Sequence, residues 1–367
     1  MVDQSRKIAE TILATVDVKI NGNRPWDIQV HHDSFFQRVL TSGSLGFGEA
    51  YMDGWWDCEA IDELVTRVLP VKIAGLQNIL GVLKSVLFNH NSKSKAFQIG
   101  KRHYDLGNDL FEAMLDQRMI YSCGYWKEAQ SLDSAQEAKL DLICKKLGLQ
   151  AGQKVLDIGC GWGGFAQFAA EKYDVRVVGI TVSKEQVQWV QQMSGGFPIE
   201  VRLQDYRDLR ENFDHIVSIG MFEHVGYKNY RLFMEVVRRN LKQDGLFLLH
   251  TIGGNISLKS TDPWIHKYIF PNSMLPSMKQ ITAATERKFI IEDWHNFGLD
   301  YDKTLMAWYH NFEKNWPSLK EHYDQRFYRM WKFYLLACAG TFRSRTNQLW
   351  QIVMSKNGVP WRYNSVR

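Results

Sequence analysis

The sequence has few cysteines, and no two of them stand in a CxxC spacing. The five lie far apart, at positions 58, 123, 144, 160 and 338. This spacing excludes a disulfide framework and a cysteine-based zinc site, and it is typical of reduced thiols in a cytosolic protein. We therefore predict no metal site and a cytoplasmic location.

Long apolar runs and repeats are also missing. No run of 18 apolar residues occurs, and residues 1–16 lack the apolar core of a secretion signal, which excludes a membrane-spanning helix and a signal peptide. With 45% hydrophobic residues, a chain of 367 residues buries a sizeable core, in one large domain or two unequal ones. The net charge of +5 is too small to indicate nucleic-acid binding by itself.

Acidic residues are absent between Glu63 and Asp105, where seven basic residues occur. Apolar residues recur there every three or four positions from 73 to 87, which predicts one apolar helix face. Such a helix with basic ends suits an anionic bilayer, but a core-packed helix followed by a solvated linker fits equally well. We place the domain boundary here, with a membrane-associated domain at 1–88, a linker at 89–102 and a second domain at 103–367.

Residues 1–70 are expected to form a small α/β unit. Helical spacing covers 8–16 and 33–43, the second helix ending at Gly43, and 16–22 alternates like a strand. Residues 48–57, GEAYMDGWWD, mix acids with large aromatics. They are interpreted as core packing or as a surface for a substrate or a second subunit.

The Gly-rich stretch KVLDIGCGWGG at 154–164 organises the second domain. It reads as a buried strand, a turn that approaches a ligand closely, and the start of a helix, with Asp157 placed to orient the ligand. A dinucleotide fingerprint requires GxGxxG. The spacing found, D-x-G-x-G-x-G-G, is instead like the first motif of methyltransferases that use S-adenosylmethionine. A plain tight turn is the third possibility.

After this turn the α/β alternation is regular. Further strands are predicted at 175–180, within 199–209, within 215–226 and at 245–254. A helix starts near 181, with Ser183 as its N-cap. This order predicts a parallel, doubly wound, Rossmann-like sheet. At the strand ends, Thr181 and Gln186 are the polar groups near a ribose, and Asp205 with Tyr206 suits an adenine amino group and ring.

Groups suited to proton chemistry stand at or near the predicted strand ends, namely Glu223, His250 and Tyr301. Cys123 lies in a proposed lid, 119–126. Each alone is more often a surface cap or a satisfied core residue. Together beside a methyl donor, they are suited to holding a small anion or to acting as a base.

Aromatic residues are dense near the C-terminus. Between Trp294 and Trp350, 57 residues include 15 aromatics. Core packing explains most of them, and the surplus also suits a tunnel for a long apolar ligand.

Several long motifs resemble those of the cyclopropane-fatty-acyl-phospholipid synthases. They are MIYSCGYW, VLDIGCGWGG, LQDYRDL, IVSIGMFEHVG, FLLHTIG, YIFPN and, nearer the N-terminus, SGSLGFGEAYMDGWWD. The similarity runs from about residue 8 to 354. The mycolic acid cyclopropane synthases are also similar but lack such an N-terminal domain.

The resemblance implies a class I methyltransferase fold. It also implies transfer of a methylene unit from S-adenosylmethionine to the cis double bond of an acyl chain in a membrane phospholipid, giving a cyclopropane ring. The family's base is a bound bicarbonate, and its ligands carry over onto Cys123, Glu223, His250, Ile252 through its backbone, and Tyr301. Cys338 matches a cysteine once taken as the nucleophile of the family. We interpret it as packing.

The resemblance and the strand-end arguments together give a cofactor-binding set. It comprises Tyr104, Tyr121, Ser122, Asp157, Gly159, Cys160, Gly161, Trp162, Gly163, Thr181, Gln186, Asp205, Tyr206 and Arg207. The expected partners are unsaturated phospholipid at the inner membrane surface, to which the protein binds peripherally, and a second copy in a homodimer. Nucleic acid is not expected.

Three other hypotheses stay open at this point. One is a methyltransferase that leaves a methyl branch or a methylene group on the acyl chain. Another is an RNA methyltransferase that holds phosphates with the basic stretch, although the aromatics lie far from the lysines. The third is a non-catalytic membrane module with a vestigial cofactor site.

Overall fold

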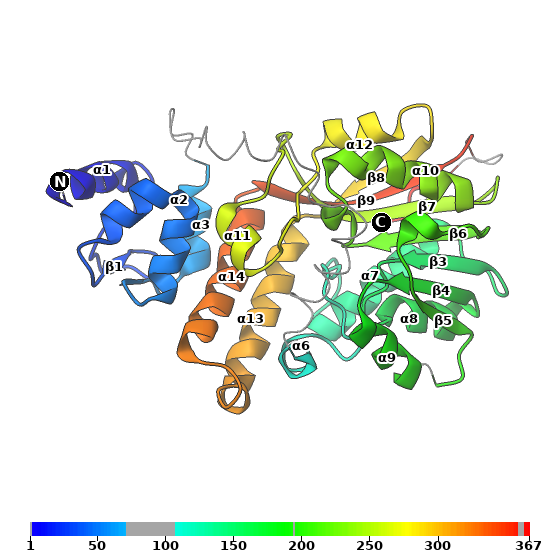
Figure 1. The fold of residues 1–367 in the computed structure, drawn as a ribbon, viewed down its shortest axis with the longest axis horizontal. Coiled ribbons are helices and arrows are strands. Elements are labelled where there is room, and N and C mark those ends of the chain that lie inside the picture. Colours follow the sequence, from blue (N-terminus) through cyan, green and yellow to red (C-terminus); the bar gives the residue numbers. More distant parts are fainter. Residues whose placement is uncertain (1, 71–106, 194, 359–362) are drawn as a thin grey trace.

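The structure, a computed structural model, describes residues 2–70, 107–193, 195–358 and 363–367. One seven-stranded sheet organises most of it (Figure 1), in the order β5-β4-β3-β6-β7-β9-β8. Five of its strands are parallel and follow the prediction. They are β3 (Lys154–Ile158), β4 (Arg176–Thr181), β5 (Ile199–Leu203), β6 (His215–Ile219) and β7 (Leu246–Gly254).

Helices cover both faces of the sheet, which confirms the doubly wound fold. One face packs against α7 (Leu132–Leu147) and α8 (Gly164–Tyr173), and the other against α10 (Tyr230–Asn240) and α12 (Met278–Thr285). Neighbouring residues of β3 divide between the two cores, since Val155 faces the first and Leu156 the second. The helix α9 (Lys184–Met193) packs against β4 and β5. Its predicted cap is confirmed, because Ser183 Oγ accepts the Gln186 N–H at 3.3 Å.

The expectation of a wholly parallel sheet is wrong. Two strands that the sequence reading did not find, β8 (Ile290–Asn296) and β9 (Asn347–Ser355), complete the sheet. The last strand lies antiparallel between β7 and β8. The chain turns back between β8 and β9, through residues 297–346, and β9 therefore runs antiparallel to both of its neighbours.

The N-terminal part is more helical than expected. It contains α1 (Val2–Ala14), α2 (Phe35–Met52), α3 (Ile61–Val68) and a two-stranded ribbon of β1 (Gln29–Val30) and β2 (Trp56–Asp57). The strand predicted at 16–22 does not form, because the chain turns at Asp17 (φ 56°) and only Ile20 makes a β-bridge. Gly43 (φ 56°, ψ −135°) is non-helical and interrupts α2 where the predicted helix ends, and a second helical segment continues to Met52.

The aromatic residues within 48–57 divide between core and half-buried positions. Tyr51 and Trp56 are buried, whereas Trp55 is half-buried. Packing therefore accounts for Tyr51 and Trp56.

A hairpin of two long helices lies between the N-terminal helices and the sheet (Figure 1), formed by α13 (Leu299–Leu319) and α14 (Gln325–Arg343). The short helices α6 (Asn108–Met114) and α11 (Pro263–Tyr268) pack nearby. One hydrophobic cluster joins the parts, from Phe35 and Trp56 to Trp308 and Trp331. Most of the aromatics between 294 and 350 pack in this hairpin and in β8 and β9.

The domain boundary remains a prediction, as do the structure and the role of the basic, acid-free stretch. The helix expected at 73–87 and the linker at 89–102 lie outside the described residues. Among the described residues, no helix combines the length and apolar character needed to cross a membrane. The same residues contain no group of three or more His, Cys, Asp or Glu side chains arranged to hold a metal ion.

Candidate active site

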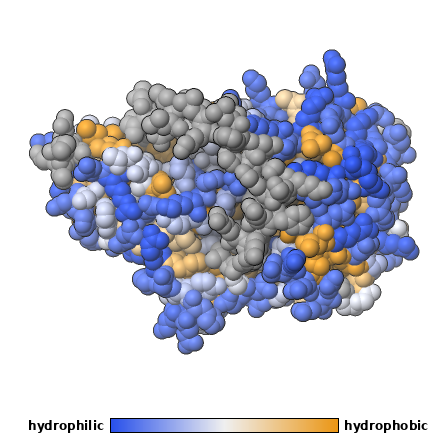
Figure 2. Space-filling view, in the orientation of Figure 1, coloured by the Kyte–Doolittle hydropathy of each residue, from blue (hydrophilic) through white to orange (hydrophobic). Residues whose placement is uncertain are grey.

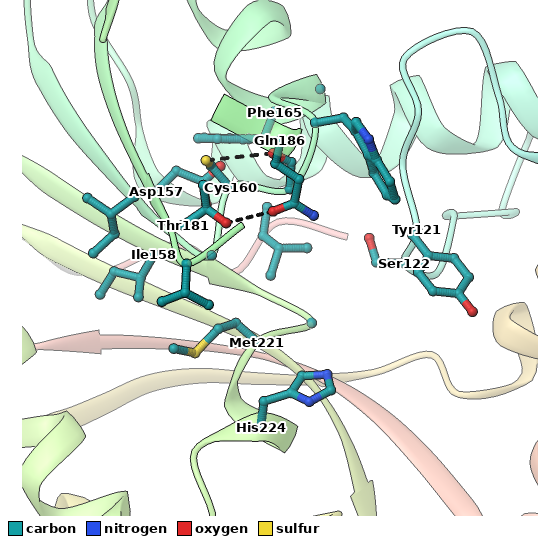
Figure 3. A pocket seen from close by; sticks show the side chains of 18 of the residues that line it. Tyr121, Ser122, Asp157, Ile158, Cys160, Phe165, Thr181, Gln186, Met221 and His224 are labelled. Atoms are coloured by element: carbon teal, nitrogen blue, oxygen red, sulfur yellow. Dashed lines mark hydrogen bonds between the residues drawn. The ribbon is translucent and has the colours of Figure 1, made fainter. Parts of the chain in front are cut away.

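A cavity of about 190 Å³ lies at the carboxyl ends of β3, β4 and β6. Twelve of the fourteen residues predicted to bind the cofactor line it: Tyr121, Ser122, Asp157, Gly159, Cys160, Gly161, Trp162, Thr181, Gln186, Asp205, Tyr206 and Arg207. Asp157, Cys160 and Thr181 lie on one side, with Tyr121 and Ser122 facing them from the other (Figure 3). Gly163 is not in the wall but forms the N-cap of α8 (φ 83°). Tyr104 lies outside the described residues.

The glycines of the turn after β3 serve different purposes. Gly159 (φ 83°) passes so close to Met221 that a Cβ would lie 2.6 Å from its side chain. A Cβ on Gly161 (φ 55°) would meet no atom within 4 Å among the residues that the structure describes. Both positions favour glycine because of their positive φ. Gly161 additionally leaves open space for a ligand next to the backbone.

Asp157 is a buried carboxyl with an unused oxygen. Its Oδ1 has no hydrogen-bond partner among the described residues. Burial raises the pKa of Asp157 to about 7, against the opposing effect of the Lys139 charge. This oxygen is therefore available to a hydrogen-bonding group of a ligand.

Lys139 is a central buried cation that the sequence reading missed. Its Nζ donates to Ser122 Oγ at 2.9 Å, and burial lowers its pKa to about 8. Its charge also acts on Asp157, Cys123 and His250. One signal was available, since Lys139 and Lys146 lie seven residues apart on the buried stripe of α7. The same helix supplies Gln136, whose Nε2 donates to the Ser122 carbonyl at 2.7 Å.

Polar groups at the ends of β4 and β5 are already paired. Thr181 Oγ1 donates to Gln186 Oε1 at 2.6 Å (Figure 3). Arg207 donates to both carboxylate oxygens of Asp205, at 2.8 and 2.6 Å. Asp205 therefore keeps only its remaining lone pairs for a ligand amino group.

Glu223 lies on the short 3₁₀ helix η2 (Phe222–His224) that follows β6. Its Oε1 accepts the Ile252 N–H at 2.7 Å, and its Oε2 has no partner among the described residues. Burial raises the pKa of Glu223 to about 7. The carboxyl is thus partly protonated at neutral pH and able to donate as well as accept.

His250 lies on β7, opposite Gln351 of β9. The Gln351 amide nitrogen is 3.3 Å from His250 Nδ1, while Nε2 has no partner among the described residues. Burial keeps the pKa of His250 well below its ordinary value, so the ring is neutral. With Nδ1 as acceptor from the amide, the proton resides on Nε2, which then donates. The role of Gln351 was missed because β9 was not predicted.

Cys123 lies near the first turns of α13, the helix that carries Tyr301. Cys123 Sγ is 3.8 Å from Thr304 Oγ1, one turn after Tyr301 on that helix. Burial raises the pKa of both the thiol and the phenol well above their ordinary values. Cys123 and Glu223 each add to the rise at Tyr301, which places these three groups within electrostatic range of one another.

None of the six residues that the resemblance associates with the chemistry lines this cavity. They are Cys123, Glu223, His250, Ile252, Tyr301 and Cys338. Their sequence neighbours Ser122 and His224 do line the cavity, as does Gly220, whose N–H donates to the His250 carbonyl at 2.9 Å. The cavity and the proton-handling groups therefore adjoin each other.

Cys338 lies on α14, within electrostatic range of Tyr301 and Tyr334. Burial raises the pKa of its thiol to about 12. The thiol stays protonated at neutral pH, which makes it a poor nucleophile.

Aromatic rings enclose the region between α13, α14 and the cavity. The Tyr121 ring packs 5.2 Å from that of Trp308, and its hydroxyl is 2.8 Å from the Tyr334 hydroxyl. Tyr301 stacks on Phe342 at 4.5 Å. These rings exclude water and present π-faces to a positive charge.

Comparison with known proteins gives a consistent set of relatives. The family model for mycolic acid cyclopropane synthetase matches residues 91–352. Over 362 residues the chain is 54% identical to the cyclopropane-fatty-acyl-phospholipid synthase of Escherichia coli, covering 96% of this chain and 94% of that protein. It is 37% identical to cyclopropane mycolic acid synthase 3 of Mycobacterium tuberculosis over 69% of this chain and 95% of that one.

Solved structures show the same likeness. The cyclopropane synthase MmaA2 from Mycobacterium tuberculosis superposes with a TM-score of 0.67 at 32% identity, over 71% of this chain and 98% of that chain. Mycolic acid cyclopropane synthase CmaA1, in a complex with SAH and CTAB, gives 0.66 at 35% identity over the same shares. The doubly wound sheet is therefore that of class I methyltransferases.

Proposed function

Because this chain belongs to the mycolic acid cyclopropane synthetase family, we propose that it forms cyclopropane rings in the acyl chains of membrane phospholipids. It is an S-adenosylmethionine-dependent methyltransferase. Its substrate is a cis-unsaturated acyl chain, to which one methylene unit is added. The observation that supports this reaction best is a ligand cavity beside two buried polar atoms without partners in the described chain, Glu223 Oε2 and His250 Nε2.

The cavity suits S-adenosylmethionine in its polar groups and its shape. Asp157 offers an unsatisfied acceptor to a ligand N–H or O–H, and Gly161 leaves the backbone open to contact. Tyr206 and Arg207 line the end where an adenine ring is expected. When bound, this cofactor supplies an electrophilic methyl group. The chain's own part is to hold it against the alkene in a dry site, since the alkene is a weak nucleophile.

We propose that bicarbonate serves as the base. Glu223 Oε2 and His250 Nε2 are two buried polar atoms that require a partner. Protonated Glu223 and neutral His250 each present one N–H or O–H, and Tyr301 supplies a third group. A small anion satisfies these donors without placing two negative charges together. When bound, bicarbonate takes up the proton that the added methyl group loses.

The residues around this site limit side reactions. Burial keeps the Cys123 and Tyr301 protons in place, so neither group competes for the methyl as an anion. The rings of Tyr121 and Trp308 exclude water and face any developing positive charge. Together they favour ring closure over capture of a cation by water.

The proposal includes peripheral association with the cytoplasmic membrane face, because the acyl chain must come from a bilayer. It also includes a homodimer, which light scattering after size-exclusion chromatography tests directly. A monomer at all concentrations would remove that part and leave the reaction unchanged.

The reaction is tested with purified protein, S-adenosylmethionine and vesicles of unsaturated phospholipid. Mass spectrometry of the released fatty acids is expected to show a gain of one CH2, and NMR is expected to show cyclopropyl protons. A branched or methylene product would identify an acyl C-methyltransferase instead. No mass gain in bicarbonate-containing buffer would contradict the function.

The role of bicarbonate has its own test. Activity is expected to fall in buffer freed of carbon dioxide and to return when bicarbonate is added. Unchanged turnover in carbonate-free buffer would show that a protein side chain is the base.

A further inference from the structure

We propose that residues 255–260 together with Met278 and Lys279, here called the β7 rim, dock the protein on an anionic phospholipid bilayer. This inference rests on the proposed function, since it says where the lipid substrate reaches the enzyme. Residues 255–260 directly follow β7, and Met278 and Lys279 begin α12, with α11 between the two parts in the chain (Figure 1).

Large apolar side chains of the rim are open to solvent. Ile256 is 66% exposed, and Leu258 and Met278 are each 53% exposed. All six consecutive residues from 255 to 260 are exposed to solvent. On the face of the molecule in Figure 2 the surface is mostly hydrophilic, with only small separate apolar areas. Adjacent exposed aliphatic side chains at one place therefore mark an interaction site.

Hydrogen bonds hold the two parts of the rim side by side. Ser257 Oγ and Ser277 Oγ are 2.7 Å apart, and Gln280 Nε2 donates to the Leu258 carbonyl at 2.9 Å. The Gly254 N–H donates to the Pro276 carbonyl at 2.9 Å. The apolar side chains are thus displayed from an anchored backbone, which lowers the entropy lost when they enter a membrane.

The charge of this segment matches an anionic surface. Lys259 and Lys279 flank the apolar side chains and are exposed. The single acid between residues 255 and 279 is Asp262, and its carboxylate is used to cap α11 by accepting the N–H groups of Trp264 and Ile265. Aliphatic side chains that penetrate the headgroup layer, with lysines at its phosphates, are typical of peripheral membrane binding.

Backbone hydrogen bonds connect the rim segment to Glu223, which is proposed to hold the base. Just before residues 255–260 the Ile252 N–H donates to Glu223 Oε1 at 2.7 Å, and just before Met278 the Met274 N–H donates to the Glu223 carbonyl at 2.7 Å. A bilayer held at the rim is therefore attached to a segment that contacts Glu223 at two places, Ile252 and Met274. This arrangement favours delivery of an acyl chain to that site over a contact that only attracts vesicles.

The test compares full-length variants in co-sedimentation with vesicles of phosphatidylglycerol and phosphatidylethanolamine. The double variant Ile256→Asp with Leu258→Asp is expected to bind about tenfold more weakly or worse, because two aliphatic side chains no longer enter the membrane. Lys259→Glu with Lys279→Glu is expected to lose binding to anionic vesicles selectively and to lessen its salt dependence. Met193→Asp, equally exposed on α9, is the matched control and should bind as the unaltered protein does.

Turnover of phospholipid dispersed in detergent separates this proposal from the proposed function. The rim variants are expected to keep that turnover while losing turnover on vesicles. Unchanged vesicle binding by a folded rim variant overturns the docking surface, as does a change only in oligomeric state, which would identify a protein interface. If no protein, altered or not, turns over lipid in detergent, the function fails, and the vesicle binding still decides the role of the rim.

Should the aspartate variant not fold, as judged by circular dichroism, Ile256→Ser with Leu258→Ser replaces it. The same loss of vesicle binding is then expected, and binding equal to that of the Met193→Asp control contradicts the docking surface.

Discussion

Replacing Glu223 with glutamine separates the stability cost of this residue from its chemical role. The side chain is 5% exposed, and one of its oxygens accepts the Ile252 N–H. Glutamine keeps that acceptor and the shape of the side chain but carries no titratable proton. The variant Glu223→Gln therefore removes the cost of a buried negative charge.

The size and sign of the effect follow from the raised pKa. Below pH 4.5 the carboxyl is protonated in both states, and between 4.5 and about 7 only the folded state keeps its proton. Folding stability is therefore lost as the pH rises through this window, and the loss is complete above about 7. The rise from 4.5 to about 7 corresponds to about 3 kcal/mol at most, since each pKa unit is worth about 1.4 kcal/mol.

The assay is urea unfolding of both proteins between pH 4.5 and 8.5, in buffer freed of carbon dioxide. The unfolding free energy of Glu223→Gln, minus that of the unaltered protein, should rise by about 3 kcal/mol across this range. Other titrating groups contribute equally to both proteins and cancel in the difference. The exposed Glu112→Gln is the control for replacing a surface carboxyl by an amide.

Turnover measurements complete this test. Glu223→Gln is expected to lower kcat by about a hundredfold or more, as loss of proton-transfer assistance does, with little change in cofactor affinity by calorimetry. A pH-independent stability difference would refute the raised pKa. Equal losses of turnover and of cofactor binding would show that Glu223 belongs to the cofactor site.

Three further substitutions test the packing and the polar contacts. Gly253→Ala places a Cβ 1.9 Å from a tryptophan ring of β9 and should lower the unfolding free energy by about 1–3 kcal/mol. In Gly254→Ala the nearest atom is 3.7 Å away, so urea unfolding should differ little, and equal losses in both variants would contradict the packing. Gln351→Leu removes the partner of His250 Nδ1 and should lower kcat about tenfold at unchanged cofactor affinity, as loss of an orienting hydrogen bond does. A kcat equal to that of the unaltered protein would show that the amide does not set the ring's proton. Asp157→Asn changes the buried acceptor in the cofactor cavity and should weaken cofactor binding about tenfold in calorimetry, whereas unchanged affinity would place the ligand elsewhere.

The sequence predicted those parts of the site that depend on strand ends. The glycine turn after β3 was recognisable because its residues need positive φ, and regular alternation with helices fixed the neighbouring strands. The placement of Glu223 and His250 on one side of the sheet could be predicted in the same way, since β6 and β7 are parallel neighbours. Residues at the ends of parallel strands meet at one edge, so their distance along the chain does not matter.

Groups that come from other elements could not be placed in this way. Gln351 belongs to β9, whose apolar run NQLWQIVMS was read with the surrounding aromatics and not as a buried strand. Lys139 lies in the middle of a helix, and only the three-dimensional packing turns it toward Ser122. The strand expected at 16–22 does not form because positive φ angles at Asp17 and Asn21 turn the chain, which the alternating sequence pattern did not reveal.

The position of α14 has a consequence for the N-terminal residues. One side of this helix contributes Tyr334 to the surroundings of Tyr121, while the same helix packs against α2 and α3. The family match begins at residue 91, yet Phe35 and Trp56 share a continuous apolar cluster with Trp308. The described residues 2–70 accordingly cover the outer side of the helix hairpin. A protein without them would have to cover the outer side of this helix hairpin by other means before it could hold an acyl chain dry.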